Sequence, residues 1–332
     1  MIMRPLVSII MPVYNAGSTL RNSLESIISQ TYKNIELCIV NDCSTDGSLE
    51  LIQTYVREFD KNNIKIRVLS HNRNQGVAAA RNTGLGMAKG KYIYYVDADD
   101  TIDRNAIQIM VETAENSDLD IIGCEWRLCF RRNQRYMNQP YFNTPEAALQ
   151  NIMRGVMRWN LWLFMVKRSL YEDNQIRFVN GVNMGEDLMV MMKLFMCAEK
   201  VGIVKKPLYN YYDQLNAKSL TNTYSTHHRN QVTANVEDVA SYSMSTKWAA
   251  LIDENLNFLK LTIKLPLLIS DNQEKYDMWA EWWKESNSFA VRNPSMPIHT
   301  KFLQYCAYKR WWLCVKLYYR FVHRFVYGFL LK

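Results

Sequence analysis

Short apolar runs alternate with helical repeats along the first hundred residues of this 332-residue chain. The runs contain few polar positions, which is typical of strands covered on both faces of a sheet. Between them, apolar residues recur every three or four positions, which indicates helices. This repetition predicts an α/β fold with a mostly parallel sheet flanked by helices. Strands are expected at 7–13, 35–40, 64–69 and 92–96, and helices after an N-cap at Ser18, at 48–59 and at 77–87.

The regular alternation ends near residue 103. From Tyr224 onward the pattern predicts a helical extension, interrupted at 293–297 by two prolines. Between these points we expect helices at 105–116 and 187–198, strands at 120–130 and 159–166, and a strand pair at 201–212 around Pro207.

Polar residues follow each of the four N-terminal strands. In open parallel sheets, ligands bind outside the carboxyl ends of the strands, so these residues should meet in one crevice. They are Tyr14-Asn15, Asn41-Asp42, His71-Asn72 and the segment 97–100 (DADD).

Asp97 and Asp99 are two residues apart at a strand end, so both carboxylates can point to the same side. Such a pair suits Mg²⁺ or Mn²⁺, which usually takes one or two carboxylates and completes its shell with water and substrate phosphate. The alternative is a polar turn that caps the next helix, with Asp100 or Thr101 as N-cap. The spacing by itself favours neither interpretation.

Two other carboxylate positions also allow both a functional and a structural interpretation. Asp42 could accept hydrogen bonds from a base or sugar, or join the N-cap network of the next helix, a role that suits Ser44 and Asp46 better. Glu186-Asp187 opens an apolar helix, where a carboxylate either complements the helix dipole or acts as a general base.

The composition, 48% hydrophobic and 22% charged, is that of a globular protein. The longest uncharged stretch, 5–20, is too short and too polar for a membrane span of about 20 apolar residues. Residues 1–17 lack a signal-peptide cleavage site, and seven scattered cysteines fit reduced thiols. We therefore expect a cytoplasmic protein.

The net charge of +8 lies entirely after Glu285, because residues 1–285 hold 32 basic and 32 acidic groups. Segment 299–332 combines seven cations with eleven aromatic residues and no acid. On a helical wheel the cationic side holds Lys309, Lys316, Arg320, His323 and Arg324, and the apolar side holds Trp311, Cys314, Tyr318, Val322, Phe325 and Phe329.

This separation predicts an interfacial helix at an anionic membrane surface. The alternative is a helix packed on its own protein or on a second subunit. Nucleic-acid binding is not expected, because the apolar side is too broad for a cationic recognition surface.

Five motifs in order and at appropriate intervals make the chain resemble the family-2 glycosyltransferases of GT-A fold. The resemblance covers roughly residues 5–222. It implies a Rossmann-like catalytic domain over 1–222 and a helical extension over 223–332. Each motif alone is weak, but five in register are specific. They are VSIIMPVYNAGSTL, VNDCSTDGS, NQGVAAARNTGL, YVDADD and MGED.

The resemblance assigns roles to individual residues. Asp97 and Asp99 match the family's D-x-D motif, with Asp99 as the direct metal ligand and Asp97 nearer to the uridine or ribose. Glu186 would contact the donor sugar, and Asp187 matches the catalytic base. Trp162 falls where the family often places an acceptor-side aromatic residue. Uracil and ribose would be held by Pro12, Val13, Tyr14, Asn15 and Asp42, with Asn74 and Arg81 as additional nucleotide contacts.

These roles imply an inverting transferase of the bacterial polysaccharide type. It would move a hexosyl or N-acetylhexosaminyl group from a UDP-sugar to a hydroxyl of a lipid-linked or surface-polysaccharide acceptor. Mg²⁺ or Mn²⁺ would stabilise the diphosphate leaving group, and Asp187 would deprotonate the acceptor. Together with the basic tail, the resemblance predicts a peripheral enzyme on the inner face of the cell membrane. One position departs from the family: Asp213 is acidic where many relatives carry a basic residue.

Two other functions fit parts of this pattern. The chain could be a non-catalytic module that binds a nucleotide or glycan at the membrane, but it retains both carboxylate pairs. A sugar nucleotidyltransferase would need a glycine-rich basic loop after the first strand, where this chain has PVYN at 12–15. We therefore expect a glycosyltransferase.

Overall fold

The computed structural model describes residues 4–212 and 225–321, which form two compact units. The expected domain boundary at 222/223 lies outside the described residues and stays a prediction. Most of α8 (Thr226–Ser243) belongs to the first unit, with the sheet. Unit 1 consists of Met1–Ala147 and Trp159–Tyr242, and unit 2 of Ala148–Arg158 and Ser243–Lys332.

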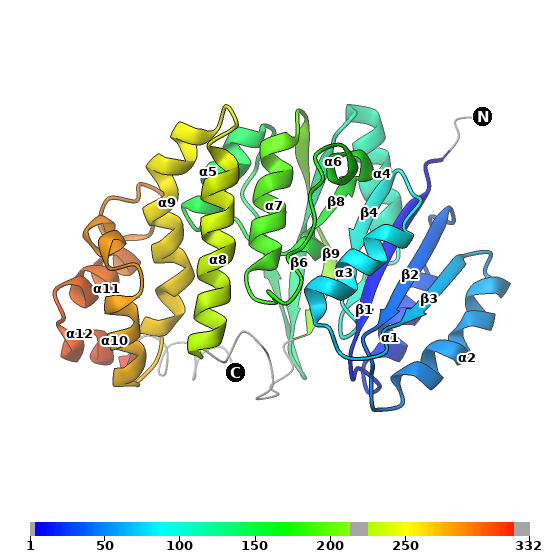
Figure 1. Ribbon diagram of the computed structural model, residues 1–332, viewed down its shortest axis with the longest axis horizontal. Helices are drawn as coiled ribbons and strands as arrows, with labels where there is room; N and C mark the ends of the chain where they lie inside the picture. Colours follow the sequence, from blue (N-terminus) through cyan, green and yellow to red (C-terminus); the bar gives the residue numbers. More distant parts are fainter. Residues whose placement is uncertain (1–3, 213–224, 322–332) are drawn as a thin grey trace. The chain divides into compact units, whose positions relative to one another are not determined.

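Unit 1 is built on a mixed sheet (Figure 1). Its described strands are β1 (Val7–Val13), β2 (Ile35–Asn41), β3 (Lys65–Ser70), β4 (Tyr92–Tyr95), β5 (Thr101–Ile102), β6 (Ile121–Cys129), β7 (Gln134–Met137), β8 (Phe164–Lys167) and β9 (Val201–Tyr212). Their order is β3-β2-β1-β4-β8-β6-β9-β5, with β7 beside β6. The first four are parallel, as predicted, whereas β8 is antiparallel to both of its neighbours.

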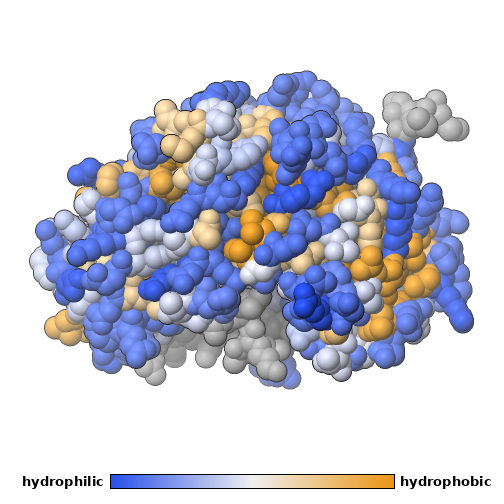
Figure 2. Space-filling model, viewed as in Figure 1, coloured by the Kyte–Doolittle hydropathy of each residue, from blue (hydrophilic) through white to orange (hydrophobic). Residues whose placement is uncertain are grey.

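The parallel strands lack alternation because both of their faces are covered. Nearly every residue of β1, β2 and β4 is buried. The edge strand β3 is mostly exposed, with Val68 and Leu69 more than a third exposed. Hydrophobic atoms accordingly gather at the surface over this edge, on the right of Figure 2.

Helices lie along both sides of this sheet. Each helix whose first and last residues were both predicted from the sequence agrees with the observed bounds to within two residues. The helices of unit 1 are α1 (Leu20–Ile28), α2 (Ser48–Lys61), α3 (Val77–Met87), α4 (Ala106–Ser117), α6 (Arg168–Asp173), α7 (Glu186–Cys197) and α8. The expected N-cap at Ser18 is wrong, because α1 begins at Leu20 after Thr19.

Two expected strands differ from the structure. Residues 201–212 form one strand rather than a pair. Pro207 pairs with Glu125 where the register of β6 shifts, a place where a proline without an N–H is tolerated. In the aromatic segment 159–166, a 3-10 turn (Leu161–Leu163) precedes β8.

Unit 2 is helical, as the pattern predicts. It contains the last part of α5 (Pro145–Met153), α9 (Ala249–Lys264), α10 (Gln273–Glu281), α11 (Ile298–Tyr308), α12 (Trp312–Tyr318) and two 3-10 turns (Leu265–Leu268 and Lys284–Phe289). The expected break at 293–297 separates the second turn from α11.

A fully buried ammonium joins several of these elements. Lys264 donates hydrogen bonds to the carbonyl oxygens of Trp282 (2.7 Å) and Trp283 (3.3 Å) and to Oδ1 of Asn287 (2.5 Å). Its Nζ also lies 4.6 Å from the ring centroid of Trp279. Burial lowers the pKa of Lys264 to about 7, and nearby Glu285 opposes that shift. Lys264 therefore ties α9 to the turn that follows α10.

The described part of the tail, up to residue 321, forms two helices, α11 and α12, instead of one. Between α11 and α12 the chain turns at Arg310, which takes a φ of 57°. Because this break separates Lys309 from Lys316, the helical wheel that grouped them is wrong. Acids of unit 2 also pair with tail cations: Glu281 with Arg310, and Asp271 with Lys316 and Arg320. Val322, His323, Arg324, Phe325 and Phe329 lie outside the described residues.

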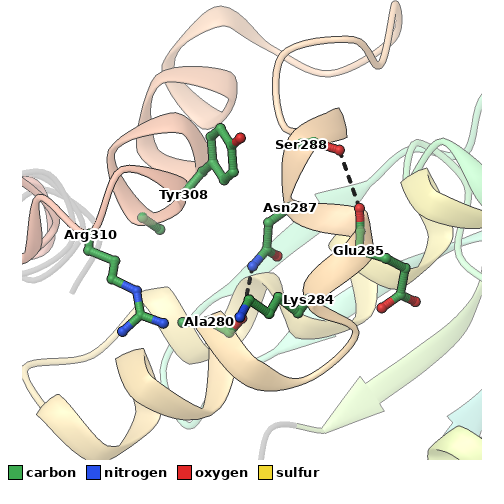
Figure 3. Close-up of a pocket in the computed structure, with 8 residues that line it drawn as sticks. Ala280, Lys284, Glu285, Asn287, Ser288, Tyr308 and Arg310 are labelled. Carbon is green, nitrogen blue, oxygen red and sulfur yellow. Dashed lines mark hydrogen bonds between the residues drawn. The ribbon is translucent and has the colours of Figure 1, made fainter.

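Unit 2 also contains a cavity of about 300 Å³ (Figure 3). Its lining includes Lys284, Asn287, Tyr308 and Arg310 but none of the expected site residues. Across the described ranges, no helix has both the length and the apolar character needed to cross a membrane.

We predict that Lys264→Met lowers the free energy of unfolding by about 2–3 kcal/mol, because three buried acceptors lose their donor. Urea unfolding of the full chain measures this loss. Lys284→Met is the matched control, since Lys284 is exposed and should tolerate the change within about 0.5 kcal/mol. Equal losses in the two variants would contradict the role assigned to Lys264.

Candidate active site

Every residue expected at the site lies in unit 1. Segments at the carboxyl ends of β1, β2 and β4 carry Asn15, Asp42 and Asp97. Two helices add the remaining charged groups: α3 carries Arg81, and the first turn of α7 carries Glu186 and Asp187.

Arg81 gathers three carboxylates around one guanidinium. Its Nη1 lies 2.7 Å from Oε1 of Glu186 and 2.5 Å from Oδ1 of Asp187. Its Nη2 lies 3.6 Å from Oδ1 of Asp97. The Arg81 side chain is only 6% exposed. Residues far apart in the sequence thus meet in one ion cluster that links α3, α7 and the end of β4.

Burial and mutual repulsion set the protonation of this cluster. Burial raises the pKa of Glu186 to about 8; the charge of Asp187 adds to the shift and Arg81 opposes it. Burial likewise raises the pKa of Asp97 to about 6, with Arg81 again opposing. Burial alone would lower the pKa of Arg81, but the three carboxylates raise it above its ordinary value. Arg81 therefore stays charged, and Glu186 takes up a proton at a higher pH than Asp97 does.

The backbone before α7 aims Asp187 into the cluster. Gly185 precedes the helix with a φ of 78°, a conformation that a glycine adopts without strain. Oδ2 of Asp187 accepts a hydrogen bond from the backbone N–H of Leu161 at 3.3 Å. One oxygen of Asp187 thus faces Arg81 and the other faces the 3-10 turn, and neither makes a side-chain cap for α7.

The segment after β4 is anchored by Asp100, which was expected at this strand end without a binding or catalytic role. Asp100 is buried and accepts hydrogen bonds from the hydroxyl of Tyr209 and the backbone N–H of Tyr212, both at 2.9 Å. The backbone N–H of Asp97 donates to the same Tyr209 hydroxyl at 3.2 Å. The interpretation of Asp100 or Thr101 as an N-cap is wrong, because β5 follows and α4 begins only at Ala106.

The donor set at this strand end fits a hard divalent cation shared with a ligand. Asp99 is exposed and the Asp97 side chain is 27% exposed, so both carboxylates can be reached. Within the described parts of the chain, no group of three or more His, Cys, Asp or Glu residues could hold a metal. A pair of carboxylates is compatible with such a cation, which usually takes one or two carboxylates and completes its shell with water and phosphate.

Asp42 organises the loop between β3 and α3. Its Oδ1 accepts from the N–H of Gln75 (2.9 Å) and contacts Nδ1 of His71 (2.7 Å), and its Oδ2 accepts from the N–H of Gly76 (2.8 Å). Asn74 donates to the Asp42 carbonyl at 3.4 Å. His71 was expected in the crevice from its place after a strand, but it was assigned no role there.

The loops after β1 and β2 are joined by side-chain hydrogen bonds. The N–H of Asn15 donates to Oγ of Ser44, and Oδ1 of Asn15 accepts from the N–H of Thr45 at 2.8 Å. The N-cap residue of α2 is Gly47 rather than Ser44 or Asp46, although Asp46 accepts from the N–H of Ser48, the first residue of the helix. Tyr14 stays 52% exposed, and its neighbours Pro12 and Val13 are half-buried and buried.

Trp162 is buried in an aromatic stack. Its ring lies 4.3 Å from that of Tyr209 and 5.6 Å from that of Tyr211, both nearly parallel. Trp126 meets it edge-on at 5.9 Å. The side chain is only 5% exposed, and its turn also supplies the Leu161 N–H that contacts Asp187. The three partners of Trp162 come from β6 and β9, which no local pattern connects to this turn.

The expected residues thus form two groups joined by α3. Asp42 and Asn74 hold the loop that leads into α3, and the N-cap residue of this helix, Gly76, donates to Asp42. Arg81 lies in the second turn of the same helix and holds the carboxylates.

Comparison with known proteins shows which family this chain resembles. The family model described as Glycosyl transferase family 2 matches residues 8–194. The uncharacterized glycosyltransferase EpsJ of Bacillus subtilis is 30% identical over 281 residues, which cover 81% of this chain and 78% of EpsJ.

Solved structures share the fold. S. aureus TarS 1-349 in complex with UDP-GlcNAc has a TM-score of 0.71 at 19% identity, covering 95% of this chain and 91% of that chain. The mannosyltransferase PcManGT from Pyrobaculum calidifontis, in complex with GDP-Man and Mn²⁺, has a TM-score of 0.56 at 16% identity, covering 96% and 88%.

The likeness to TarS confirms the expected GT-A fold, here a mixed sheet flanked by helices with further helices at the C-terminal side. The family match and the similarity to EpsJ agree with the five motifs. The chain therefore belongs to glycosyltransferase family 2 and is a glycosyltransferase.

Proposed function

We propose that this enzyme transfers a hexosyl or N-acetylhexosaminyl group, with inversion, from a UDP-sugar to an acceptor hydroxyl. The observation that carries the proposal is the place of Asp187: a carboxylate held by Arg81 and the Leu161 N–H, near Asp97. A group so fixed on a rigid helix can accept a proton from a hydroxyl in a defined direction.

The proposed reaction needs one base and one displacement. The acceptor hydroxyl gives its proton to Asp187 while its oxygen attacks the anomeric carbon, and the bond to the diphosphate breaks on the opposite side. One such displacement inverts the anomeric configuration. Glu186, which contacts Arg81 on the same helix turn, is placed to contact the donor sugar.

The donor would bind along the carboxyl ends of the strands. The exposed ring of Tyr14 can stack on a base, and Pro12, Val13, Asn15, Asp42 and Asn74 complete the nucleotide-binding segment that we propose. The complex of TarS with UDP-GlcNAc supports a UDP-sugar. Arg81 would act mainly by holding the carboxylates, since they occupy its guanidinium.

We propose Asp99 and Asp97 as the ligands of a divalent cation, Mg²⁺ or Mn²⁺. When bound there, the cation stabilises negative charge on the departing diphosphate. The Mn²⁺ of PcManGT supports this proposal.

The proposed acceptor is a lipid-linked or surface-polysaccharide glycan. The Trp162 stack would form the acceptor side of the site, next to the turn that contacts Asp187. Because Trp162 is almost fully buried, it would act chiefly by supporting Tyr211, which is partly exposed.

We propose that unit 2 binds an anionic membrane surface, which would make the enzyme peripheral on the inner face of the cell membrane. Large apolar residues four positions apart are exposed on both tail helices, and Lys301, Lys309 and Lys316 are interspersed with them. Val315, on the inner side of α12, is buried, so this apolar row is additional to the packed face. The row consists of Ile298 (85% exposed), Phe302 (55%), Leu313 (71%), Leu317 (55%) and Phe321 (71%).

The first test is UDP release from a panel of UDP-sugars, with a lipid-linked or polysaccharide acceptor. Asp187→Asn should lower kcat at least a hundredfold, because the base is lost while its shape remains. UDP affinity, measured by calorimetry, should change less than threefold. EDTA should abolish release by the wild type, and Mg²⁺ or Mn²⁺ should restore it.

The matched control is Asp173→Asn, at an exposed position of α6, which should leave turnover unchanged. Full activity of Asp187→Asn would remove Asp187 from the role of base. Silence of the wild type with every donor and acceptor would instead favour a non-catalytic binding module.

The second prediction concerns the ion cluster. Arg81→Met should lower the free energy of unfolding by about 3–5 kcal/mol, because buried carboxylates lose their counter-charge. Arg81→Lys, which keeps the charge, should lose less. Urea unfolding measures both, with Arg57→Met on the exposed face of α2 as control. A loss no larger than that of the control would show that the cluster contributes nothing to stability.

We predict that the full chain floats with anionic phosphatidylglycerol vesicles but not with phosphatidylcholine vesicles. Replacing Leu313, Leu317 and Phe321 together with serine should reduce the bound fraction at least tenfold, since the apolar row would be lost. Val291→Ser, at another half-exposed apolar position of unit 2, is the control. Undiminished flotation of the triple variant would refute the assignment.

A further inference from the structure

The loop that leads into α7 is held by side chains from two helices. This loop, 178–185, contains Gly181 and Gly185, both with positive φ. It delivers Glu186 and Asp187 to the ion cluster. The backbone conformation of this loop therefore sets the position of the first turn of α7, which carries the two carboxylates.

On one side the loop is bonded to α8. Gln231 donates from Nε2 to the carbonyl of Gly181 (2.9 Å) and accepts at Oε1 from the N–H of Asn183 (3.1 Å). Asn235 donates from Nδ2 to the carbonyl of Met184 (2.7 Å). Gln231 is 8% exposed and Asn235 is 1% exposed, so these bonds are shielded from water.

On the other side the loop is bonded to α3. Asn82 accepts from the N–H of Phe178 (2.9 Å) and donates to its carbonyl (2.8 Å). Asn183 accepts from the N–H of Ala78 (3.0 Å), in the first turn of the helix that carries Arg81. A Cβ on Gly76 would lie 2.4 Å from the Asn183 amide, which shows how closely the two segments approach.

Asn183 thus connects the two sets of bonds. Its backbone N–H is held by Gln231, and its side chain caps α3. The two helices that must align Arg81 with Asp187 are therefore coupled through this one loop, and α8 supplies its outer support.

The bonds from Gln231 and Asn235 are not what attaches α8 to unit 1. Farther along the helix, Asp238 pairs with Lys193 of α7 at 2.7 Å, and Val236 and Val239 are buried. Oδ1 of Asn235 has no hydrogen-bond partner among the described residues. Burying an amide that makes only one hydrogen bond costs free energy. We take this cost to mean that the bond from Asn235 has a function.

We infer that Gln231 and Asn235 are positioning residues, which fix the loop 178–185 so that Arg81 and the proposed base Asp187 stay aligned. This inference rests on the proposed function. Misplacing a reacting group by about 1 Å can lower the rate a hundredfold. Loss of these bonds should therefore lower kcat more than it affects folding.

The test uses the full chain with Gln231→Met and Asn235→Leu, which keep side-chain bulk and remove the bonds. Asn230→Leu, on the exposed face of the same helix, is the matched control. Amide hydrogen exchange should become at least tenfold faster at 181–188 and at Ala78 in the two variants. It should stay unchanged in the control and in the sheet.

With a UDP-sugar that the wild type turns over, kcat should fall at least tenfold in both variants while the donor KM changes less than threefold. Unchanged exchange in the loop, or a kcat equal to that of the control, would overturn the inference. If the wild type releases UDP from no donor, the proposed function fails, but the exchange experiment still decides whether α8 holds the loop. If a variant does not fold, Gln231→Glu, which keeps the bond to Asn183 and loses the bond to Gly181, takes its place.

Discussion

One buried guanidinium is the constraint on which this site depends. Arg81 cannot be left unpaired in a nearly water-free position, and neither can the carboxylates around it. The end of β4 therefore has to bring Asp97, and the start of α7 has to bring Glu186 and Asp187, to within ion-pairing distance of Arg81. The fold must hold α3, the end of β4 and the start of α7 in register, because a charge left unpaired there would cost several kcal/mol.

The supports around the cluster follow from that requirement. Asp100 fastens the segment after β4 to β9, and Asp42 fastens the loop that leads into α3. Asn183 joins that helix to the loop before α7. Asp99 and the ring of Tyr14 take no part in these supports and stay accessible.

The local patterns succeeded where burial on both faces leaves a continuous apolar run. They predicted the observed ends of β1 and α3, and they predicted that the first strands are parallel. They failed where long-range contacts decide. Pro207 suggested two strands, but a register shift in β6 accommodates it in one. The tail was expected as one helix, yet Arg310 turns the chain between α11 and α12.

The sequence by itself determined the class of fold, the family and the identity of the polar residues at the strand ends, because periodicity and motif spacing are local properties. The total charge of the tail also follows from the sequence. The structure adds that part of this charge is paired with Asp271 and Glu281 within unit 2. Only the tertiary structure decided that Arg81 meets three carboxylates and that Trp162 is buried in a stack. Glu186 and Asp187 lie 105 and 106 positions from Arg81, and the aromatic partners of Trp162 come from β6 and β9. The energies of these contacts depend on burial, which a local pattern does not contain.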